Sequence, residues 1–234
     1  MTSYKLCDML SVMNKFDTYL NLLLEWNSKM NLTAITDPDE IRVKHFADSL
    51  TCLDTGYIND GDSLVDVGTG AGFPGLPIRI INDSIKLTLI DSLNKRVNFL
   101  KAVCNELKID ADCVHIRAED AGKSNIYRER FDISVSRAVA NMSVLSEYNL
   151  PLVRVGGYFL AMKGKEIEDE LNAAKSLIKQ LGGEVREVQI HQFNDAGGTC
   201  YTHSIVIIQK TAATPDKFPR SAKNIGKNNF VRFF

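Results

Sequence analysis

The feature that most constrains this chain is a glycine-rich turn between an apolar run and a helix-forming stretch. The turn, Asp66-Val67-Gly68-Thr69-Gly70-Ala71-Gly72-Phe73-Pro74-Gly75, follows the apolar run at 63–65. It leads into residues 76–81, which carry a proline near their start. A strand, a glycine turn and a helix N-terminus in this order predict a nucleotide-type pocket, because glycine lets the backbone approach a ligand where a Cβ atom would collide.

Two kinds of cofactor fit this turn. Residues 70–75 match the dinucleotide pattern G-x-G-x-x-G, which arises easily in glycine-rich turns. Asp66 favours a different ligand, because a carboxylate here repels a pyrophosphate but attracts the sulfonium and ammonium groups of S-adenosylmethionine. Asp91 ends the next apolar run, 86–90, and can accept hydrogen bonds from the ribose of either cofactor. We therefore expect S-adenosylmethionine, with an NAD(P)-dependent oxidoreductase as the alternative.

Most of the chain alternates predicted strands and helices. Strands are expected at 63–65, 86–90, 113–116, 131–136, 156–162, 184–190 and 204–208, and helices at 76–81, 94–107, 141–153 and 166–181. A turn-rich loop separates the last two strands, so we expect them to pair antiparallel. The pattern predicts an α/β fold, a seven-stranded Rossmann-like sheet of the class I SAM-dependent methyltransferase type, with its site at the carboxyl edge.

Three regions are expected along the chain. Apolar residues at helical spacing over 8–30, and the helix-start signal Asp37-Pro38-Asp39-Glu40, predict an N-terminal helical extension, 1–60. The methyltransferase domain follows at 61–212. Residues 213–234 are expected to form a basic, mobile C-terminal tail, which either contacts phosphates or is a frayed terminus. Its charged residues are Lys217, Arg220, Lys223, Lys227 and Arg232, against Asp216.

Composition limits the class of protein. The chain has 234 residues, of which 44% are hydrophobic, and a net charge of −1, which gives a sizeable core and no global attraction to nucleic acid. The five cysteines are scattered without a C-x-x-C motif, so we expect a reducing compartment and no metal site. We see no secretory leader or bilayer-length apolar segment, so we expect a cytoplasmic protein without a membrane partner.

Several segments carry a resemblance to a known family. They are Trp26-Asn27, Met30-Asn31-Leu32-Thr33, residues 43–49 (VKHFADS), residues 66–77, residues 91–97 (DSLNKRV), Ser136-Arg137-Ala138, Lys163-Gly164, Thr214-Pro215 and Phe218-Pro219-Arg220. With them the chain closely resembles the ribosomal RNA small-subunit methyltransferase G family, also called glucose-inhibited division protein B. The likeness runs in order over nearly the whole chain.

The resemblance implies an activity and a set of cofactor residues. The family transfers a methyl group from S-adenosylmethionine to N7 of one guanine in 16S ribosomal RNA, so the implied partner is that RNA or a small-subunit particle. Family cofactor contacts fall on Gly68, Phe73, Ala118, Glu119 and Arg137. To these the turn and the strand ends add Asp66, Gly70 and Asp91. The chain departs from the family at Thr202-His203, where relatives often carry arginine.

The chemistry leaves the catalytic residues open. N7 of guanine is a lone-pair nucleophile without a proton, so no general base is required, and Arg137 and Lys163 are the candidates. An ion pair for Arg137 and ordinary solvation for Lys163 are equally consistent with the sequence. His45 either forms an RNA-facing edge of the helical extension with Arg42 and Lys44 or is a capping or packing residue, and it is left out of the catalytic candidates. A non-catalytic ribosome assembly factor that binds S-adenosylmethionine and RNA is a further alternative, and we expect a monomer.

Overall fold

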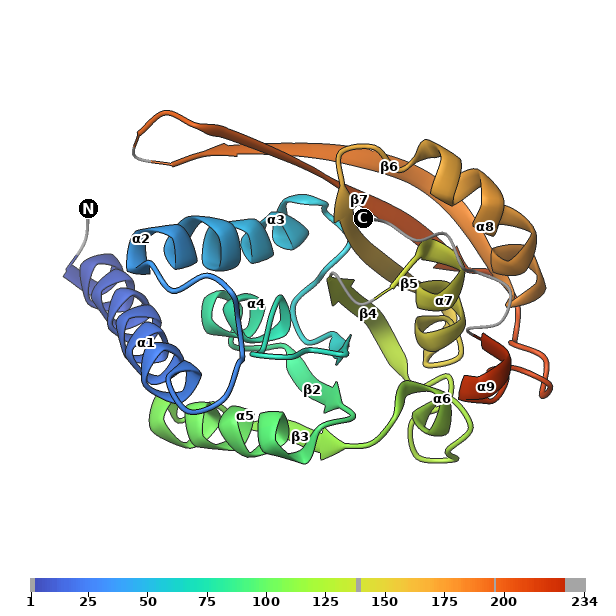
Figure 1. Ribbon diagram of the computed structural model, residues 1–234, viewed down its shortest axis with the longest axis horizontal. Coiled ribbons are helices and arrows are strands. Elements are labelled where there is room, and N and C mark those ends of the chain that lie inside the picture. Colours follow the sequence, from blue (N-terminus) through green and yellow to red (C-terminus); the bar gives the residue numbers. More distant parts are fainter. Residues whose placement is uncertain (1–2, 138–139, 196, 226–234) are drawn as a thin grey trace.

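The computed structural model describes residues 3–137, 140–195 and 197–225. Within these ranges seven strands form one sheet in the order β3-β2-β1-β4-β5-β7-β6 (Figure 1). The strands are β1 (Ser63–Val67), β2 (Lys86–Asp91), β3 (Ala111–His115), β4 (Phe131–Arg137), β5 (Val153–Gly164), β6 (Gly183–Asn194) and β7 (Cys200–Lys210). Strands β1 to β5 are parallel, and β7 pairs antiparallel with both β5 and β6. The predicted seven-stranded α/β fold with an antiparallel last pair is confirmed.

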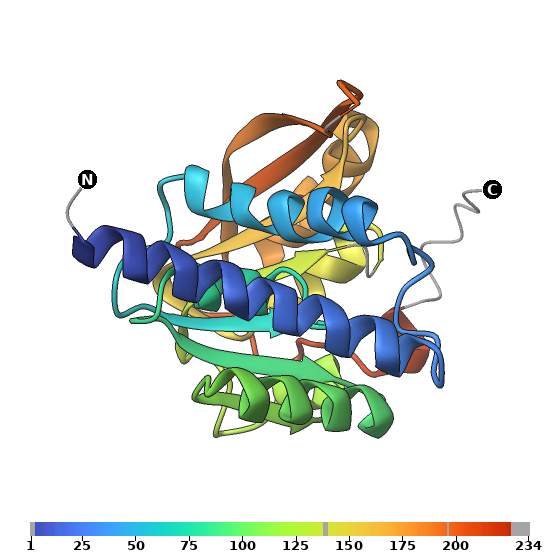
Figure 2. The same ribbon diagram turned by 90° about the vertical axis from the view of Figure 1, so that its left-hand side faces the viewer.

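Helices cover both faces of this sheet (Figures 1 and 2). They are α1 (Ser3–Asn27), α2 (Pro38–Ile41), the π-helix η1 (Arg42–Ala47), α3 (Asp48–Asp54), α4 (Gly75–Ile81), α5 (Asn94–Leu107), α6 (Ala118–Ala121), α7 (Met142–Asn149), α8 (Glu168–Gln180) and α9 (Ala222–Ile225). In the part of the chain that the structure describes, no helix combines the length and apolar character needed to cross a membrane.

The core lies on the two faces of the sheet. On one face α1, α3, α4 and α5 pack against alternate strand residues such as Leu64, Leu89 and Val135. On the other face α7 and α8 pack against Phe159 and Val206. Because both faces are covered, the central strands β1, β2 and β4 are buried at nearly every position. The N-terminal extension shares the first core with the sheet, and Figure 2 shows α1 lying across that face.

The helical segment before β1 is not one regular helix. Asp37 caps α2 by accepting the Glu40 amide hydrogen at 2.9 Å, and Pro38 occupies the first turn, as the sequence predicts. The sequence predicts a continuous helix over 39–52, but six residues of it, Arg42–Ala47, form the π-helix η1. A π-turn changes the backbone pairing locally and is frequent at functional sites.

Residues 211–225 pack against the domain and differ from the mobile tail expected there. The buried Lys210 ammonium donates to the carbonyl oxygens of Leu150 (2.6 Å) and Val153 (3.2 Å) and to the Thr214 hydroxyl (2.7 Å). Arg128 donates to the carbonyl oxygens of Gly122, Thr214 and Phe218. Polar contacts between residues distant in sequence leave no signal in the local composition. The basic composition of this stretch therefore led to the prediction of a mobile tail. Residues 226–234, which include Lys227 and Arg232, lie outside the described residues.

Candidate functional site

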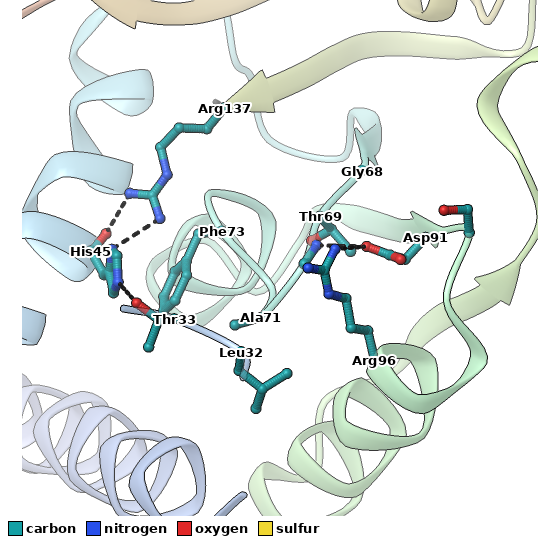
Figure 3. Close-up of a pocket in the computed structure, with 12 residues that line it drawn as sticks. Leu32, Thr33, His45, Gly68, Thr69, Ala71, Phe73, Asp91, Arg96 and Arg137 are labelled. Carbon is teal, nitrogen blue, oxygen red and sulfur yellow. Dashed lines mark hydrogen bonds and ion pairs between the residues drawn. The ribbon is translucent and has the colours of Figure 1, made fainter. Parts of the chain in front are cut away.

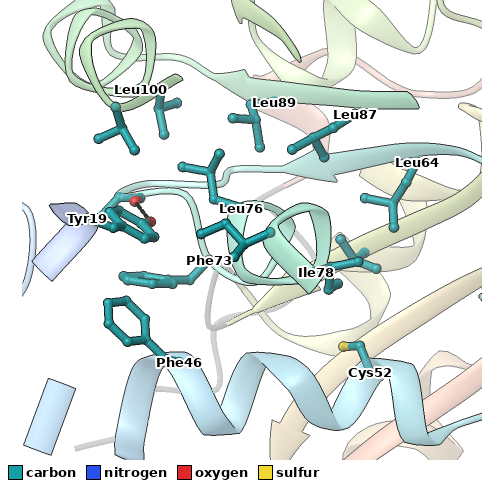
Figure 4. Packing of buried hydrophobic residues seen from close by; sticks show 14 of the residues in the cluster. Tyr19, Phe46, Cys52, Leu64, Phe73, Leu76, Ile78, Leu87, Leu89 and Leu100 are labelled. Carbon is teal, nitrogen blue, oxygen red and sulfur yellow. Dashed lines mark hydrogen bonds between the residues drawn. The ribbon is translucent and has the colours of Figure 1, made fainter. Parts of the chain in front are cut away.

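The glycine-rich turn lies at the carboxyl end of β1. Gly68 (φ +70°) and Gly70 (φ +61°) adopt the left-handed conformation that favours glycine. The Gly68 amide donates to the carbonyl oxygen of Ile90 on β2 at 2.9 Å. Tyr19 of α1 donates its hydroxyl hydrogen to the carbonyl oxygen of Ala71, and its ring packs 5.4 Å from that of Phe73 (Figure 4). The turn is therefore held both by the sheet and by the N-terminal extension.

Asp66 lies behind this turn and lines neither of the cavities in front of it, which corrects the expectation that it faces the cofactor. The side chain is fully buried, and its Oδ2 accepts from the Thr69 hydroxyl at 2.7 Å and the Gly75 amide at 2.8 Å. A Cβ atom on Gly75 would lie 2.9 Å from this oxygen. The alternation of β1 places Asp66 on the same face as Leu64, toward α4. Asp66 thus braces the turn from within the fold.

Two adjoining cavities lie at the carboxyl edge of the sheet, with volumes of about 360 and 240 Å³. Both are lined by Gly68, Asp91 and Ser92. The first cavity is lined also by Leu32, Thr33, His45, Thr69, Gly70, Ala71, Phe73, Arg96 and Arg137 (Figure 3). The second is lined also by Val67, Ile90, Ile116, Arg117, Ala118, Glu119, Ala140 and Tyr148. All the cofactor residues proposed from the sequence except Asp66 therefore border one cavity or both.

Asp91 forms the junction between the two cavities. Its carboxylate accepts from the Gly70 amide at 3.0 Å and from the Leu93 amide at 2.8 Å, while Arg96 lies 3.5 Å away. The side chain is only 2% exposed. These bonds tie the end of β2 to the glycine turn, and they fix the carboxylate at the cavity wall.

Glu119 lines the second cavity. It stands in the first turn of α6, is 5% exposed, and accepts from Arg117 Nε at 2.6 Å. Tyr148 of α7 lines the same cavity. The second cavity therefore combines apolar and aromatic side chains with the carboxylates of Asp91 and Glu119, a lining suited to a purine nucleoside.

Arg137, at the end of β4, forms one wall of the first cavity (Figure 3). Its guanidinium donates to Asp48 Oδ2 at 2.7 Å and to the carbonyl oxygen of Lys44 at 3.3 Å, and it lies 4.9 Å from the centre of the Phe73 ring. The His45 ring stacks on Phe73 at 4.7 Å. The ion pair that the sequence left open for Arg137 thus exists, and the same side chain still borders the cavity.

Lys163 does not line either cavity. Its ammonium pairs with Glu170 of α8 at 2.7 Å and donates to the carbonyl oxygen of Ala140 at 3.0 Å, and the side chain is 14% exposed. Lys163 therefore connects α8 to the segment after β4, and it is not an ordinary solvated lysine.

Sequence reasoning missed part of the first cavity. His45, which was left out of the catalytic candidates, lines it together with Thr33, and His45 Nε2 lies 2.7 Å from the Thr33 hydroxyl. Both residues belong to the family-like segments 30–33 and 43–49, far before the glycine turn in sequence. Those segments were the one available signal, since helical spacing alone does not distinguish a cavity residue from a packing residue.

Burial, and then the charge of Arg137, lower the pKa of His45 from 6.5 to about 4. The ring is therefore neutral at pH 7. Its Nδ1 lies 3.2 Å from Arg137 Nη2 and 3.1 Å from the carbonyl oxygen of Lys44, and its Nε2 lies 2.7 Å from the Thr33 hydroxyl. A neutral ring here adds no second positive charge to the wall beside Arg137.

The lowered pKa of His45 predicts a loss of stability in acid. The unfolded chain binds this proton near pH 6.5 and the folded chain only near pH 4, so stability falls as the pH drops through that window. Between pH 7 and pH 5, wild-type protein should lose about 2 kcal/mol more free energy of unfolding than His45→Gln, measured by urea titration.

A second group titrates in the same range with the opposite sign. Burial raises the pKa of Asp66 from 3.8 to about 6, despite its hydrogen bonds from Thr69 and Gly75, so its contribution to stability is lost as the pH rises through that window. Asp66 is present in both proteins, so its effect cancels in the comparison of wild type with His45→Gln. The same pH dependence in both proteins would contradict the neutral state of His45.

Comparison with known proteins identifies the family. The family model described as rRNA small subunit methyltransferase G matches residues 12–196. The chain belongs to this family. Curated proteins named Ribosomal RNA small subunit methyltransferase G include one from Alkaliphilus metalliredigens, 49% identical over 87% of this chain and 84% of that protein. Another, from Alkaliphilus oremlandii, is 51% identical over 89% and 87%, and one from Clostridium kluyveri is 48% identical over 92% and 89%.

Solved structures show the same fold at low identity. A SAM-dependent methyltransferase from Methanosarcina mazei is 14% identical, with a TM-score of 0.52 over 68% of this chain and 97% of that one. The M. jannaschii protein TYW2 in complex with AdoMet is 11% identical, with a TM-score of 0.51 over 70% and 76%. The methyltransferase G family uses S-adenosylmethionine, so this cofactor is confirmed over the dinucleotide.

The cavities fit S-adenosylmethionine. The second cavity offers the aromatic and carboxylate lining that an adenine needs, and Asp91 stands where a ribose would bridge to the first cavity. The left-handed glycines beside Asp91 keep the floor of the junction free of side chains. Among the described residues, no cluster of three or more His, Cys, Asp or Glu side chains is arranged to hold a metal ion.

Proposed function

We propose that this methyltransferase G protein methylates N7 of a guanine in 16S ribosomal RNA, with S-adenosylmethionine as the donor. The observation that carries the proposal is the pair of joined cavities at the carboxyl edge of the sheet. One has the lining of a nucleoside site, and the other has a wall of neutral histidine, phenylalanine and arginine. The curated relatives, at 46–51% identity, are named for the small-subunit ribosomal RNA.

Each cofactor residue has a role in this proposal. Glu119 accepts from the adenine amino group, and Asp91 accepts from the ribose hydroxyls, since both carboxylates border the cavities. The backbone at Gly68 and Gly70 contacts the methionyl part, and Ala118 packs on the adenine. S-adenosylmethionine supplies an electrophilic methyl group on a sulfonium. Asp66 acts indirectly, by fixing the turn through Thr69 and Gly75.

The first cavity then receives the guanine beside the methyl group. N7 attacks through a lone pair and loses no proton, so the protein must align two reacting atoms instead of placing a base. Phe73 and His45 present ring faces, and Arg137 presents N–H donors, at the wall of this cavity. The purine becomes positively charged on methylation, and the neutral state of His45 avoids a further charge opposite it.

The partner in this proposal is the RNA or an assembling small-subunit particle. Arg117 is 57% exposed beside the second cavity and Arg96 is 34% exposed beside the first, so both can reach phosphates at the mouth. The net charge of −1 means that attraction to RNA is local to the site and not a property of the whole surface. A cytoplasmic monomer remains part of the proposal.

The test is to map the transferred methyl group. Protein is incubated with radiolabelled donor and with small-subunit RNA or particles that lack the modification, and the labelled nucleoside is identified after digestion. We expect 7-methylguanosine at one position. Label at another atom would overturn the N7 assignment, and donor binding without any labelled RNA would favour the non-catalytic assembly factor. Comparing naked RNA with particles in the same assay identifies the true substrate.

A further inference from the structure

Asp48 lies between two nitrogen donors that come from two different strands of the sheet, β4 and β7. Its Oδ2 accepts from Arg137 at the end of β4, at 2.7 Å, and its Oδ1 accepts from His203 Nδ1 on β7. The three side chains are only 11–15% exposed. Charge-assisted hydrogen bonds of this kind are stronger than neutral ones, and they are screened less when buried.

The far side of the His203 ring is also engaged. His203 Nε2 lies 3.0 Å from the Thr51 hydroxyl, which also lies 2.6 Å from the carbonyl oxygen of Asp48. The ring thus contacts Asp48 through Nδ1 and Thr51 through Nε2. Its orientation is fixed at both ends.

The position of His203 in the sheet makes it a rigid support. It pairs with Gly164 at the end of β5 and with His191 on β6. Asp48 begins α3 directly after η1, whose carbonyl oxygens also accept from Arg137. Burial by itself would raise the pKa of Asp48, but the hydrogen bond from His203 and the charge of Arg137 bring it below its usual value. Asp48 is thus ionised at neutral pH and can hold both donors.

We propose that His203, acting through Asp48, is a positioning residue that holds the Arg137 guanidinium against Phe73 at the wall of the first cavity. Arginine has many side-chain rotamers. Asp48 can hold Arg137 in a single rotamer only if the Asp48 carboxylate does not rotate about its own side-chain bonds. His203 supplies the second bond that stops this rotation. The test by kcat rests on the proposed function, whereas the test by the Kd for S-adenosylmethionine does not.

The test is a double-mutant cycle between positions 203 and 137. His203→Phe keeps a ring and removes both ring nitrogens, whereas His203→Asn keeps an N–H near the Nδ1 position. We expect His203→Phe to lower kcat about 10-fold in the wild-type background and less than about 2-fold in an Arg137→Lys background. We expect His203→Asn to restore kcat to within about 3-fold of wild type.

His191→Phe is the matched control. His191 stands opposite His203 on β6 with ring centres 5.7 Å apart, and its Nε2 has no hydrogen-bond partner among the described residues. The change alters the same hairpin without touching Asp48, so we expect kcat within about 2-fold of wild type. Equal losses from His203→Phe in both backgrounds, no rescue by His203→Asn, or a similar loss from His191→Phe would each overturn the proposal.

Two further measurements test the proposal if His203→Phe does not fold or if the protein does not methylate RNA. If His203→Phe does not fold, Thr51→Val removes the hydroxyl that contacts His203 Nε2, and this variant enters the same cycle. If wild-type protein binds S-adenosylmethionine but labels no RNA, the proposed function fails, and the cycle is then measured on the donor Kd by calorimetry. Non-additive changes in Kd between positions 203 and 137 would support the proposal that His203 positions Arg137, and additive changes would overturn it.

Discussion

Replacing Gly68 with arginine is expected to abolish binding of S-adenosylmethionine while the domain stays folded. Gly68 lines both cavities, so a long side chain at this position occupies the junction that the cofactor must cross. Its left-handed backbone (φ +70°) adds a strain of about 1–2 kcal/mol for any L side chain. This is small against the stability of a typical domain. Calorimetry should show affinity reduced at least about 100-fold, the loss expected when a tightly packed ligand subsite is blocked.

Gly61 provides a matched control for this substitution. It also adopts a left-handed conformation (φ +81°), but a Cβ atom added there meets no atom within 4 Å, and it lies in the loop before β1, at the opposite end of the strand from the cavities. Gly61→Arg therefore carries the same backbone strain and the same added charge without blocking a cavity. We expect wild-type donor affinity for Gly61→Arg. Wild-type affinity for Gly68→Arg, or an equal loss in both variants, would show that the pocket is assigned wrongly.

The fold was predictable because its signals are local. The apolar residues of β1, β2 and β4, and the helical spacing of residues 94–107, each reflect burial of one segment in the fold. The turn-rich loop before β7 was enough to predict an antiparallel last pair. The glycine turn placed Gly68 and Asp91 at the same edge of the sheet, where the cavities lie. The order of elements along the chain carries this information without any knowledge of side-chain contacts.

The missed features depend on side-chain direction and on distant partners. The sequence predicted that Asp66 faces the cofactor, but β1 alternation turns it toward α4, where Thr69 and Gly75 satisfy one of its oxygens. Asp48 and His203 are 155 positions apart, and nothing in either local segment indicates that they meet. The π-helix η1 has no sequence signature that distinguishes it from the α-helix expected there. Such features follow from the packing of the complete fold.

The segment after β7 is where the structure differs most from the sequence prediction. Its packing can be tested by a stability measurement. Glu147 of α7 is fully buried, and its carboxylate accepts from the Arg220 amide at 2.6 Å and from Arg220 Nη2 at 2.7 Å. Its neighbour Tyr148 lines the second cavity. Arg220, predicted from the sequence to lie in a mobile tail, thus pairs with the buried Glu147, the neighbour of a residue that lines the second cavity.

Arg220→Leu is expected to lower the free energy of unfolding by about 3 kcal/mol, because it leaves the buried Glu147 carboxylate without its cation. The value is at the low end for a broken buried pair, since the Arg220 side chain is 28% exposed and its amide still donates to Glu147. Urea unfolding at pH 7.5 measures the loss. Donor affinity should weaken only a few-fold, because the Tyr148 ring loses support but remains in place.

Two controls separate this pair from a general effect of removing a charge. Arg42→Leu breaks a pair with Asp17 in which both side chains are about half exposed, 44% and 52%, and should change stability by less than about 0.5 kcal/mol. The double variant Glu147→Leu, Arg220→Leu removes the buried acid together with its partner, so it should recover most of the loss seen in Arg220→Leu. A double variant no more stable than the single one would mean that packing of residues 211–225, and not the unpaired carboxylate, determines the cost.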